Sequence, residues 1–138
     1  MFSDMPALKN LVLPVSAVQV DEDAFGNCTA LESVTLPLSL NKLSVSTGCT
    51  SLSEIVISEV NQTFATIDGL LYNKAVTELL WCPRCIKAER LTLPATLTHI
   101  KKYTFEGCAI GEIVLPETVT LIDDYAFAKS EIKSIVLP

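Results

Sequence analysis

Long apolar runs are absent from this 138-residue chain, although 49% of its residues are hydrophobic. No window approaches the roughly 18 consecutive apolar residues of a membrane-spanning helix. The first ten residues, MFSDMPALKN, lack the basic stretch followed by an apolar stretch that marks a secretory signal peptide. The sequence therefore predicts no membrane span and no signal peptide in this chain, and its apolar side chains must be buried in a fold or against partners.

Basic residues are in the minority, with 10 Lys and Arg against 16 Asp and Glu and a net charge of −6. Proteins bind nucleic acids through a basic footprint, so this balance argues against nucleic acid as a partner. Histidine occurs only once, at His99. Catalysis by a histidine-activated nucleophile therefore has one candidate residue and no obvious partner for it.

The stretch LLWCPRC (79–85) is the strongest local motif, and it looks like a thioredoxin-type W-C-x-x-C or half of a zinc ribbon. A redox dithiol places its first cysteine at a helix N-terminus, but here Cys82 ends a strand-like run and precedes Pro83. A zinc site takes about four ligands, usually from two such pairs, and the chain has one pair. A structural role for Cys82 and Cys85 is favoured; a redox-sensitive pair and a zinc site are the alternatives. We predict no enzyme and no catalytic residue, cofactor or metal.

Internal repetition organises the chain. Six similar segments, of which LESVTLP and IGEIVLP are examples, end at Pro14, Pro37, Ser58, Pro94, Pro116 and Pro138. Five of the six segments keep the terminal proline, and the spacing is about 22 residues except for one longer interval of 36 between Ser58 and Pro94. A constant period of this length indicates stacked supersecondary units, which is a solenoid.

A second repeated sequence pattern lies between the prolines. Phe25, Phe105 and Phe127 occupy one repeat position, and Cys28, Cys108 and Ser130 follow each of them by three residues. The unit NKLSVSTGC keeps its cysteine, Cys49, but has no phenylalanine. We expect the segment before each proline to form a strand, because its apolar residues alternate and proline ends the pairing. The phenylalanines should fill the core from the opposite side, and the cysteines should form a ladder of small buried side chains.

The unit ETVTLIDDYAFAKSEIKSIVLP (117–138) resembles the BspA-type leucine-rich repeat, whose units read approximately V-x-x-I-x-x-x-A-F-x-x-C-x-x-L-x-x-[IV]-x-[IL]-P. The resemblance covers essentially the whole chain. It implies a mainly β solenoid of about six units with short helical or irregular convex segments. It also implies protein recognition, because such proteins are often associated with the surfaces of mucosal bacteria and protozoan parasites and are implicated in adhesion.

The long interval differs from the other units. Long units of the resembled family carry a segment similar to DGLLYNK followed by LLWCP, both of which stand in this chain. The residues themselves predict two short strands joined by a turn at 73–76, a β-hairpin inserted into the solenoid. We therefore expect a single domain over 1–138, a fragment of a longer array, in which 59–94 is a long repeat with a hairpin insertion.

Candidate binding residues follow from the strand phase. If Leu31, Val34 and Leu36 point into the core, Ser33 and Thr35 point outward. The same phase predicts one continuous exposed column along the strand face and a second column beside it. From these columns, the residues expected to bind protein are Val12, Thr35, Glu54, Val56, Arg90, Thr92, Glu112, Val114 and Val136. The alternative is that Val and Thr are there because they suit strands.

The leading functional hypothesis is a non-enzymatic recognition module that binds an extracellular-matrix or cell-surface protein through the strand face. The alternative is an intracellular scaffold or self-associating array, since the terminal repeats look uncapped. A thiol-redox or metal enzyme that uses Cys82 and Cys85 is the third. Location at the cell surface, as part of a longer protein, follows from the resemblance, while the missing signal peptide leaves a cytoplasmic location open.

Overall fold

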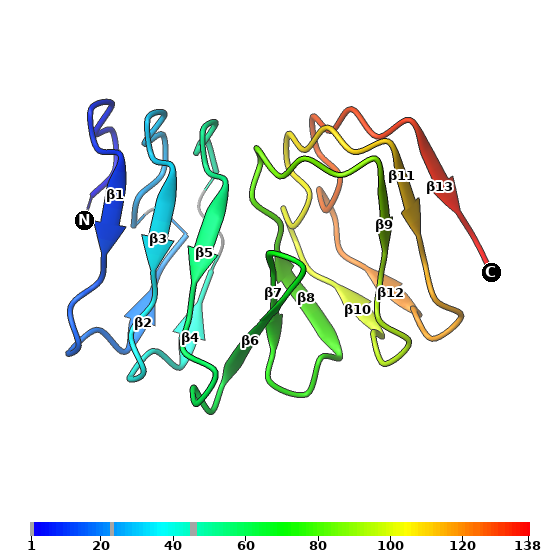
Figure 1. The fold of residues 1–138 in the computed structure, drawn as a ribbon, viewed down its shortest axis with the longest axis horizontal. Helices are drawn as coiled ribbons and strands as arrows, with labels where there is room; N and C mark the ends of the chain where they lie inside the picture. Colours follow the sequence, from blue (N-terminus) through cyan, green and yellow to red (C-terminus); the bar gives the residue numbers. More distant parts are fainter. Residues whose placement is uncertain (1, 23, 45–46) are drawn as a thin grey trace.

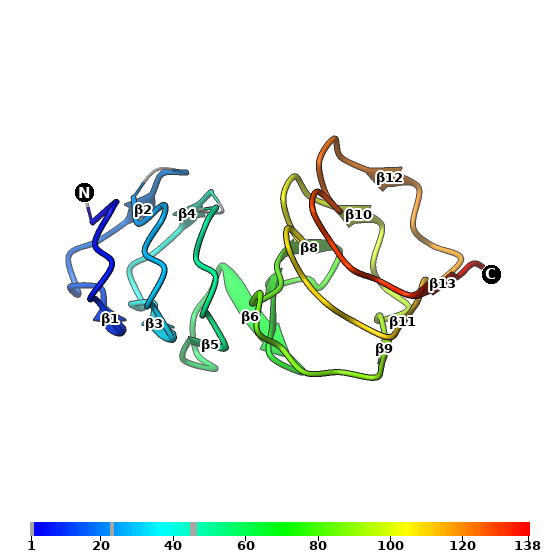
Figure 2. The same ribbon diagram turned by 90° about the horizontal axis from the view of Figure 1, so that it is seen from above.

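The chain forms a mainly β solenoid, shown by a computed structural model that describes residues 2–22, 24–44 and 47–138. Within these ranges the chain contains strands and turns but no helix, and so no helix long and apolar enough to cross a membrane. The convex side, where short helical segments were one expectation, is built from turns and two-residue strands instead. Figures 1 and 2 show the coils stacked along one axis with the termini at opposite ends.

The segments before the prolines form the expected parallel strands. They lie in two separate three-stranded sheets, β1 (Asn10–Val12), β3 (Ser33–Thr35) and β5 (Glu54–Val56), and β9 (Arg90–Thr92), β11 (Glu112–Val114) and β13 (Ser134–Val136). Each strand pairs in register with its repeat equivalent, so Val12 lies beside Thr35 and Thr35 beside Val56. The middle residue of each strand up to β11 is buried, whereas that of β13, Ile135, is 44% exposed. Period-2 alternation therefore predicts the inward face correctly.

The opposite, convex side carries shorter strands. β2 (Gln19–Val20) pairs with β4 (Lys42–Leu43), and β10 (His99–Ile100) lies between β12 (Leu121–Ile122) and β8 (Glu78–Trp81). The strand β12 pairs in register with β10, so His99 lies beside Leu121 and Ile100 beside Ile122. The strand β8 belongs to the long interval. It pairs with β10, so the convex strands of the second half continue from the long interval.

The long interval forms three antiparallel strands, β6 (Phe64–Ile67), β7 (Leu70–Asn73) and β8, which we call the partition. They belong to one five-stranded sheet with β10 and β12. The β7–β8 hairpin is as expected, while β6 was not predicted. Both faces of β7 and β8 are buried. Leu71 and Trp81 pack into the core of the first half of the chain, whereas Leu70 and Tyr72 pack into the core of the second half. The partition thus separates two hydrophobic cores and contacts both.

Trp81 supplies the large side chain that the third repeat unit lacks. Its indole is 4% exposed and stacks on Phe25, with ring centroids 5.6 Å apart. Phe105 and Phe127 stack in the same way in the second half, at 5.1 Å. The unit that contains Cys49 has no phenylalanine. Trp81 of the partition packs instead against Phe25 of the preceding unit. The tryptophan of the 79–85 motif is therefore a core residue.

The strand ladder is interrupted between β5 and β9, which corrects the expectation of one continuous exposed column. These two strands do not pair, and each is the edge of its own sheet. The physical reason is the partition: its β6–β7 segment enters the fold between them (Figures 1 and 2). The six column residues are consequently split into one group of three on each sheet.

Replacing Lys129 with glycine should stabilise the chain. Lys129 has φ 54°, and the residues at its repeat position in two other units are glycines, Gly48 at 81° and Gly107 at 67°. An L-residue in this left-handed region costs about 1–2 kcal/mol, of which the greater unfolded-state freedom of glycine cancels part. We expect Lys129→Gly to raise the free energy of unfolding by about 0.5–1 kcal/mol, measured by urea denaturation. The exposed Lys133, whose φ is not positive, is the matched control, and Lys133→Gly should lower it.

Candidate functional site

The first sheet presents what we call the amino-terminal strand face, made by the outward residues of β1, β3 and β5. Its central column is Val12, Thr35 and Val56, with Val12 71% and Val56 39% exposed. In the column beside it, Ser33 Oγ lies 3.0 Å from Asn10 Oδ1. The structure therefore brings three of the predicted binding residues together in a β-branched strip on this sheet.

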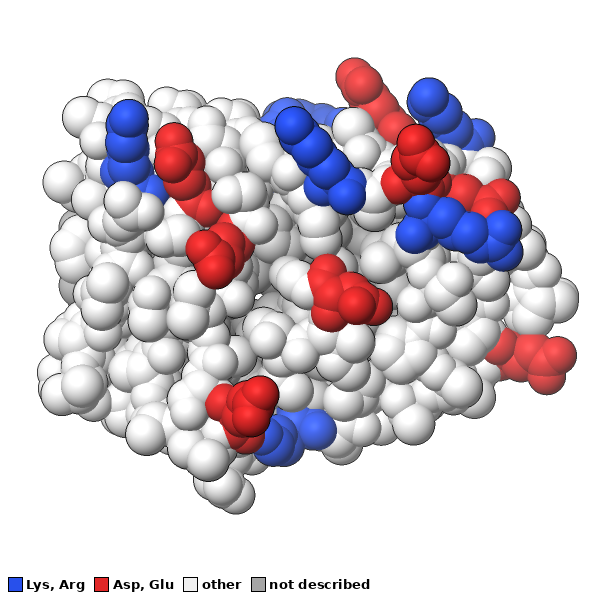
Figure 3. All heavy atoms as spheres, in the orientation of Figure 1, with Lys and Arg blue, Asp and Glu red and all other residues white. Residues whose placement is uncertain are grey.

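Three further apolar residues lie at the turns that follow these strands, and sequence reasoning missed them. Val15 is 87% exposed, Leu38 60% and Val60 65%. Hydrogen bonds stack the turns that carry them: Ser39 Oγ lies 2.6 Å from Val15 O, and Asn61 Nδ2 lies 3.4 Å from Leu38 O. Figure 3 shows the lower part of this half of the molecule almost without charged side chains. The repeat position after the proline could have revealed Val15 and Leu38, which are equivalent.

The second sheet presents the carboxy-terminal strand face, and its polar column is internally paired. Arg90 Nη1 lies 2.8 Å from Glu112 Oε2, and Ser134 Oγ donates to Glu112 Oε1 at 3.3 Å. The other column on this face is Thr92, Val114 and Val136. An ion pair therefore accompanies the β-branched column here, whereas the polar column of the amino-terminal strand face carries one charged residue, the exposed Glu54 beside Ser33.

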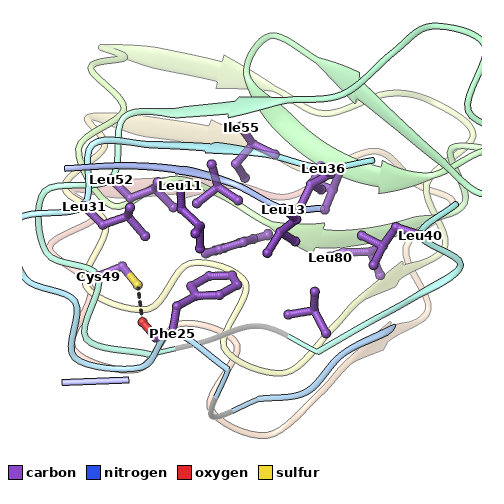
Figure 4. Close-up of a cluster of buried hydrophobic side chains, with 14 of the residues drawn as sticks. Leu11, Leu13, Phe25, Leu31, Leu36, Leu40, Cys49, Leu52, Ile55 and Leu80 are labelled. Atoms are coloured by element: carbon purple, nitrogen blue, oxygen red, sulfur yellow. Dashed lines mark hydrogen bonds between the residues drawn. The ribbon is translucent and has the colours of Figure 1, made fainter. Parts of the chain in front are cut away.

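The cysteine ladder is confirmed. Cys28, Cys49 and Cys108 are each at most 5% exposed, and all five cysteines of the chain are free thiols. Figure 4 shows Cys49 in the first core, where its Sγ donates to Phe25 O at 3.4 Å. Burial raises the pKa of the Cys49 thiol to about 12. These thiols are packing groups that donate weak hydrogen bonds to the backbone of the preceding unit.

Cys82 and Cys85 occupy unlike surroundings. Cys82 is 2% exposed, whereas Cys85 is exposed and donates to Thr50 O at 3.0 Å. A hydrogen bond with Cys108 and burial raise the pKa of the Cys82 thiol, the opposite of the shift that a redox nucleophile needs. Over the three ranges the structure covers, no cluster of three or more His, Cys, Asp or Glu residues could hold a metal ion. This geometry weighs against the redox and zinc interpretations.

Thiol labelling should separate these environments. In the native chain we expect Cys85 alone to react within minutes with a thiol reagent such as 5,5′-dithiobis(2-nitrobenzoate) at pH 8, because the other four thiols are buried. Denaturation should expose the remainder. Cys85→Ser should abolish the fast phase, and a fast phase of more than one thiol in the native chain would contradict the structure.

His99 has a carboxylate partner that the sequence did not suggest. Its Nε2 lies 2.7 Å from Asp123 Oδ1, and this hydrogen bond lowers the pKa of the Asp123 carboxyl. His99 is the first residue of β10, and Asp123 directly follows the neighbouring strand β12. No hydroxyl or thiol hydrogen-bonds to the imidazole among the residues described, so the pair ties two units together and is not part of a nucleophilic triad.

A family model with the description "BspA type Leucine rich repeat region (6 copies)" matches residues 1–75 and 82–138. Among curated proteins, none matches the chain. Solved structures do: the pneumococcal vaccine antigen PcpA aligns with a TM-score of 0.79 and 27% identity over 95% of this chain and 40% of that chain. A leucine-rich repeat protein from Eubacterium ventriosum aligns with a TM-score of 0.77 and 20% identity, covering 94% of this chain and 42% of that one.

A third similar structure is a leucine-rich cell surface protein from Faecalibacterium prausnitzii, with a TM-score of 0.71 and 19% identity over 94% of this chain and 41% of that chain. The chain thus spans about two-fifths of the length of each solved relative. The two alignments at or below 20% identity show the shared fold, and the family model covers nearly every residue. The chain belongs to the BspA-type leucine-rich repeat family, whose repeats are typically non-catalytic.

Proposed function

We propose that this chain is a protein-recognition module that binds an extracellular-matrix or cell-surface protein through its amino-terminal strand face. The observation that carries the proposal is the exposed apolar strip of Val12, Thr35 and Val56, bordered by Val15 and Leu38. Exposed apolar patches on soluble domains mark interaction sites, and solenoid sheets offer extended binding surfaces. The predicted residues on the carboxy-terminal strand face would lie at the margin of such an interface, because their charges are paired with each other.

The relatives support a surface role. One solved structure of similar fold is named a cell surface protein and another a vaccine antigen. We therefore propose that the chain is displayed at a cell surface as part of a longer protein, where an adhesive contact would be made. No ligand follows from these names, so the partner is defined by the surface it must match: largely uncharged and able to cover β-branched side chains.

The test is binding of the purified chain to immobilised fibronectin, laminin, collagen and intact host-cell surface proteins by biolayer interferometry. Val12→Lys/Val56→Lys charges the amino-terminal strand face at two exposed positions. Thr92→Lys/Val136→Lys is the matched control on the other sheet. The proposal expects saturable binding that the first double variant weakens at least about tenfold and the control leaves within about twofold. Equal binding by both variants, or no binding to any probe, would refute it.

A further inference from the structure

Two backbone hydrogen bonds recur between the strands of successive units, one at each end of the strand. The amide after the last strand residue donates to the next unit, as in Leu36 N–H to Val56 O at 2.9 Å and Leu115 N–H to Val136 O at 3.0 Å. The first strand amide donates to the previous unit, as in Glu112 N–H to Glu89 O at 2.8 Å. Each inner strand is therefore saturated on both edges.

This pattern fails at one place inside the solenoid. Ile57 stands where Leu36 and Leu115 stand in their units, and Arg90 stands where Glu112 stands. Within residues 2–22, 24–44 and 47–138, neither the Ile57 nor the Arg90 amide donates to another backbone group, and β5 and β9 are not paired. β5 and β9 are therefore two unpaired sheet edges, and the β6–β7 segment of the partition lies between them.

The space beside the β9 edge is open. A cavity of about 520 Å³ lies between that edge and the β6–β7 turn, and its lining residues are Asp68, Ile86, Lys87, Ala88, Arg90, Leu91 and Thr92. The turn is fixed by Asp68 and Gly69, both at positive φ, and Gly69 lies close enough to Ile86 that an added Cβ would meet its Cδ1 at 3.2 Å. The floor of the cavity is therefore held in place by packing.

We propose that the interruption between β5 and β9 is a site for strand addition, in which an extended peptide segment of a partner protein pairs with the free edge of β9. Edge strands with open N–H and C=O groups bind extended peptides through backbone hydrogen bonds, and side-chain pockets then add specificity. The peptide runs parallel to β9, since every strand in that sheet is parallel. The inference rests on the proposed protein-binding role and adds to it a second site that works through the backbone.

The occupant has a definable chemistry. Its residue opposite Leu91 faces the interior, because Leu91 is 7% exposed and points inward from β9, so it must be small or apolar. Lys87 and Asp68 both line the cavity and are exposed, and Lys87 makes no ion pair among the described residues. An acidic peptide residue therefore suits the position beside Lys87, and a basic or neutral one the position beside Asp68. Proline is excluded wherever the peptide must donate to β9.

The test begins with selection of binders from a phage-displayed library of random linear peptides on the immobilised chain. An enriched peptide is then synthesised, and its affinity is measured by fluorescence anisotropy against three forms of the chain. Thr92→Pro removes an edge N–H that points into the gap by strand alternation. Thr92→Val is its control, because valine keeps both the amide and the shape. Val12→Lys/Val56→Lys is the third form.

We expect Thr92→Pro to weaken binding at least about tenfold, the equivalent of one or more lost hydrogen bonds, and Thr92→Val to change it by less than about twofold. Independently of any variant, peptide binding to the wild-type chain should slow hydrogen exchange at the Arg90 amide on the edge of β9. No enriched peptide, or bound peptides that leave the Arg90 amide unprotected, would overturn the proposal. We expect Val12→Lys/Val56→Lys to bind the peptide as the wild-type chain does. Because the same variant should lose binding through the amino-terminal strand face, it distinguishes the two proposed sites.

Discussion

Trp81→Ala should destabilise the chain by about 3–5 kcal/mol, the cost of removing a buried tryptophan from a packed core. Trp81 comes from the partition but packs into the first core, where it stacks on Phe25. Its loss would leave a cavity beside the unit that has no phenylalanine of its own. The free energy of unfolding should be measured by far-ultraviolet circular dichroism in urea, because the chain has only this one tryptophan and the variant has no indole fluorescence.

Trp81→Phe is the matched variant, since it keeps an aromatic ring that can stack on Phe25. It should lose less than half as much stability as Trp81→Ala. If Trp81→Ala cost less than about 1 kcal/mol, the indole could not be the core element that replaces the missing repeat phenylalanine.

Asn61→Ala should cost about 2–4 kcal/mol, because it removes the buried polar group that anchors the start of the partition. Asn61 is 1% exposed, and its Oδ1 accepts from the Thr63 and Phe64 amides, both at 2.8 Å. Its Nδ2 lies 3.4 Å from both Pro37 O and Leu38 O in the preceding unit. The alanine variant would leave these backbone groups without a partner in a site closed to water.

Asn10→Ala is the control for Asn61→Ala. Asn10 is exposed on the amino-terminal strand face and makes one hydrogen bond with Ser33, so its replacement should change the free energy of unfolding by less than about 0.5 kcal/mol. Equal effects of the two substitutions in urea denaturation would show that Asn61 does not anchor the partition.

The repeat phase predicts most of the solenoid because each of its features has a local cause. A strand ends at each repeat boundary, alternation sets which residue points inward, and Cys28, Cys49 and Cys108 fall in the core because they share a repeat position. Family membership follows from the same residues. These features depend on neighbours within one unit or on its equivalent in the next, which a single sequence contains.

The partition was only half predicted because its packing depends on contacts between distant segments. The alternation rule assumes one buried face, yet β7 and β8 are buried on both. Their continuous apolar runs, LLY and LLW, are the signal of two-sided burial that could have been recognised. β6 has a weaker pattern, and its position between β5 and β9 interrupts the column that repeat phase alone makes continuous. The pairing of His99 with Asp123 likewise needs the stacking register of β10 and β12.

The partition interrupts the strand ladder between β5 and β9 and so divides the strand face of the solenoid into two separate faces. Amide hydrogen exchange of the free chain tests it most directly, by comparison of repeat-equivalent positions. The Ile57 and Arg90 amides should exchange at least about tenfold faster than those of Leu36 and Glu112, which donate across the ladder. Equal protection at all four amides would mean that the ladder is continuous, and would contradict both the division into two faces and the strand-addition site.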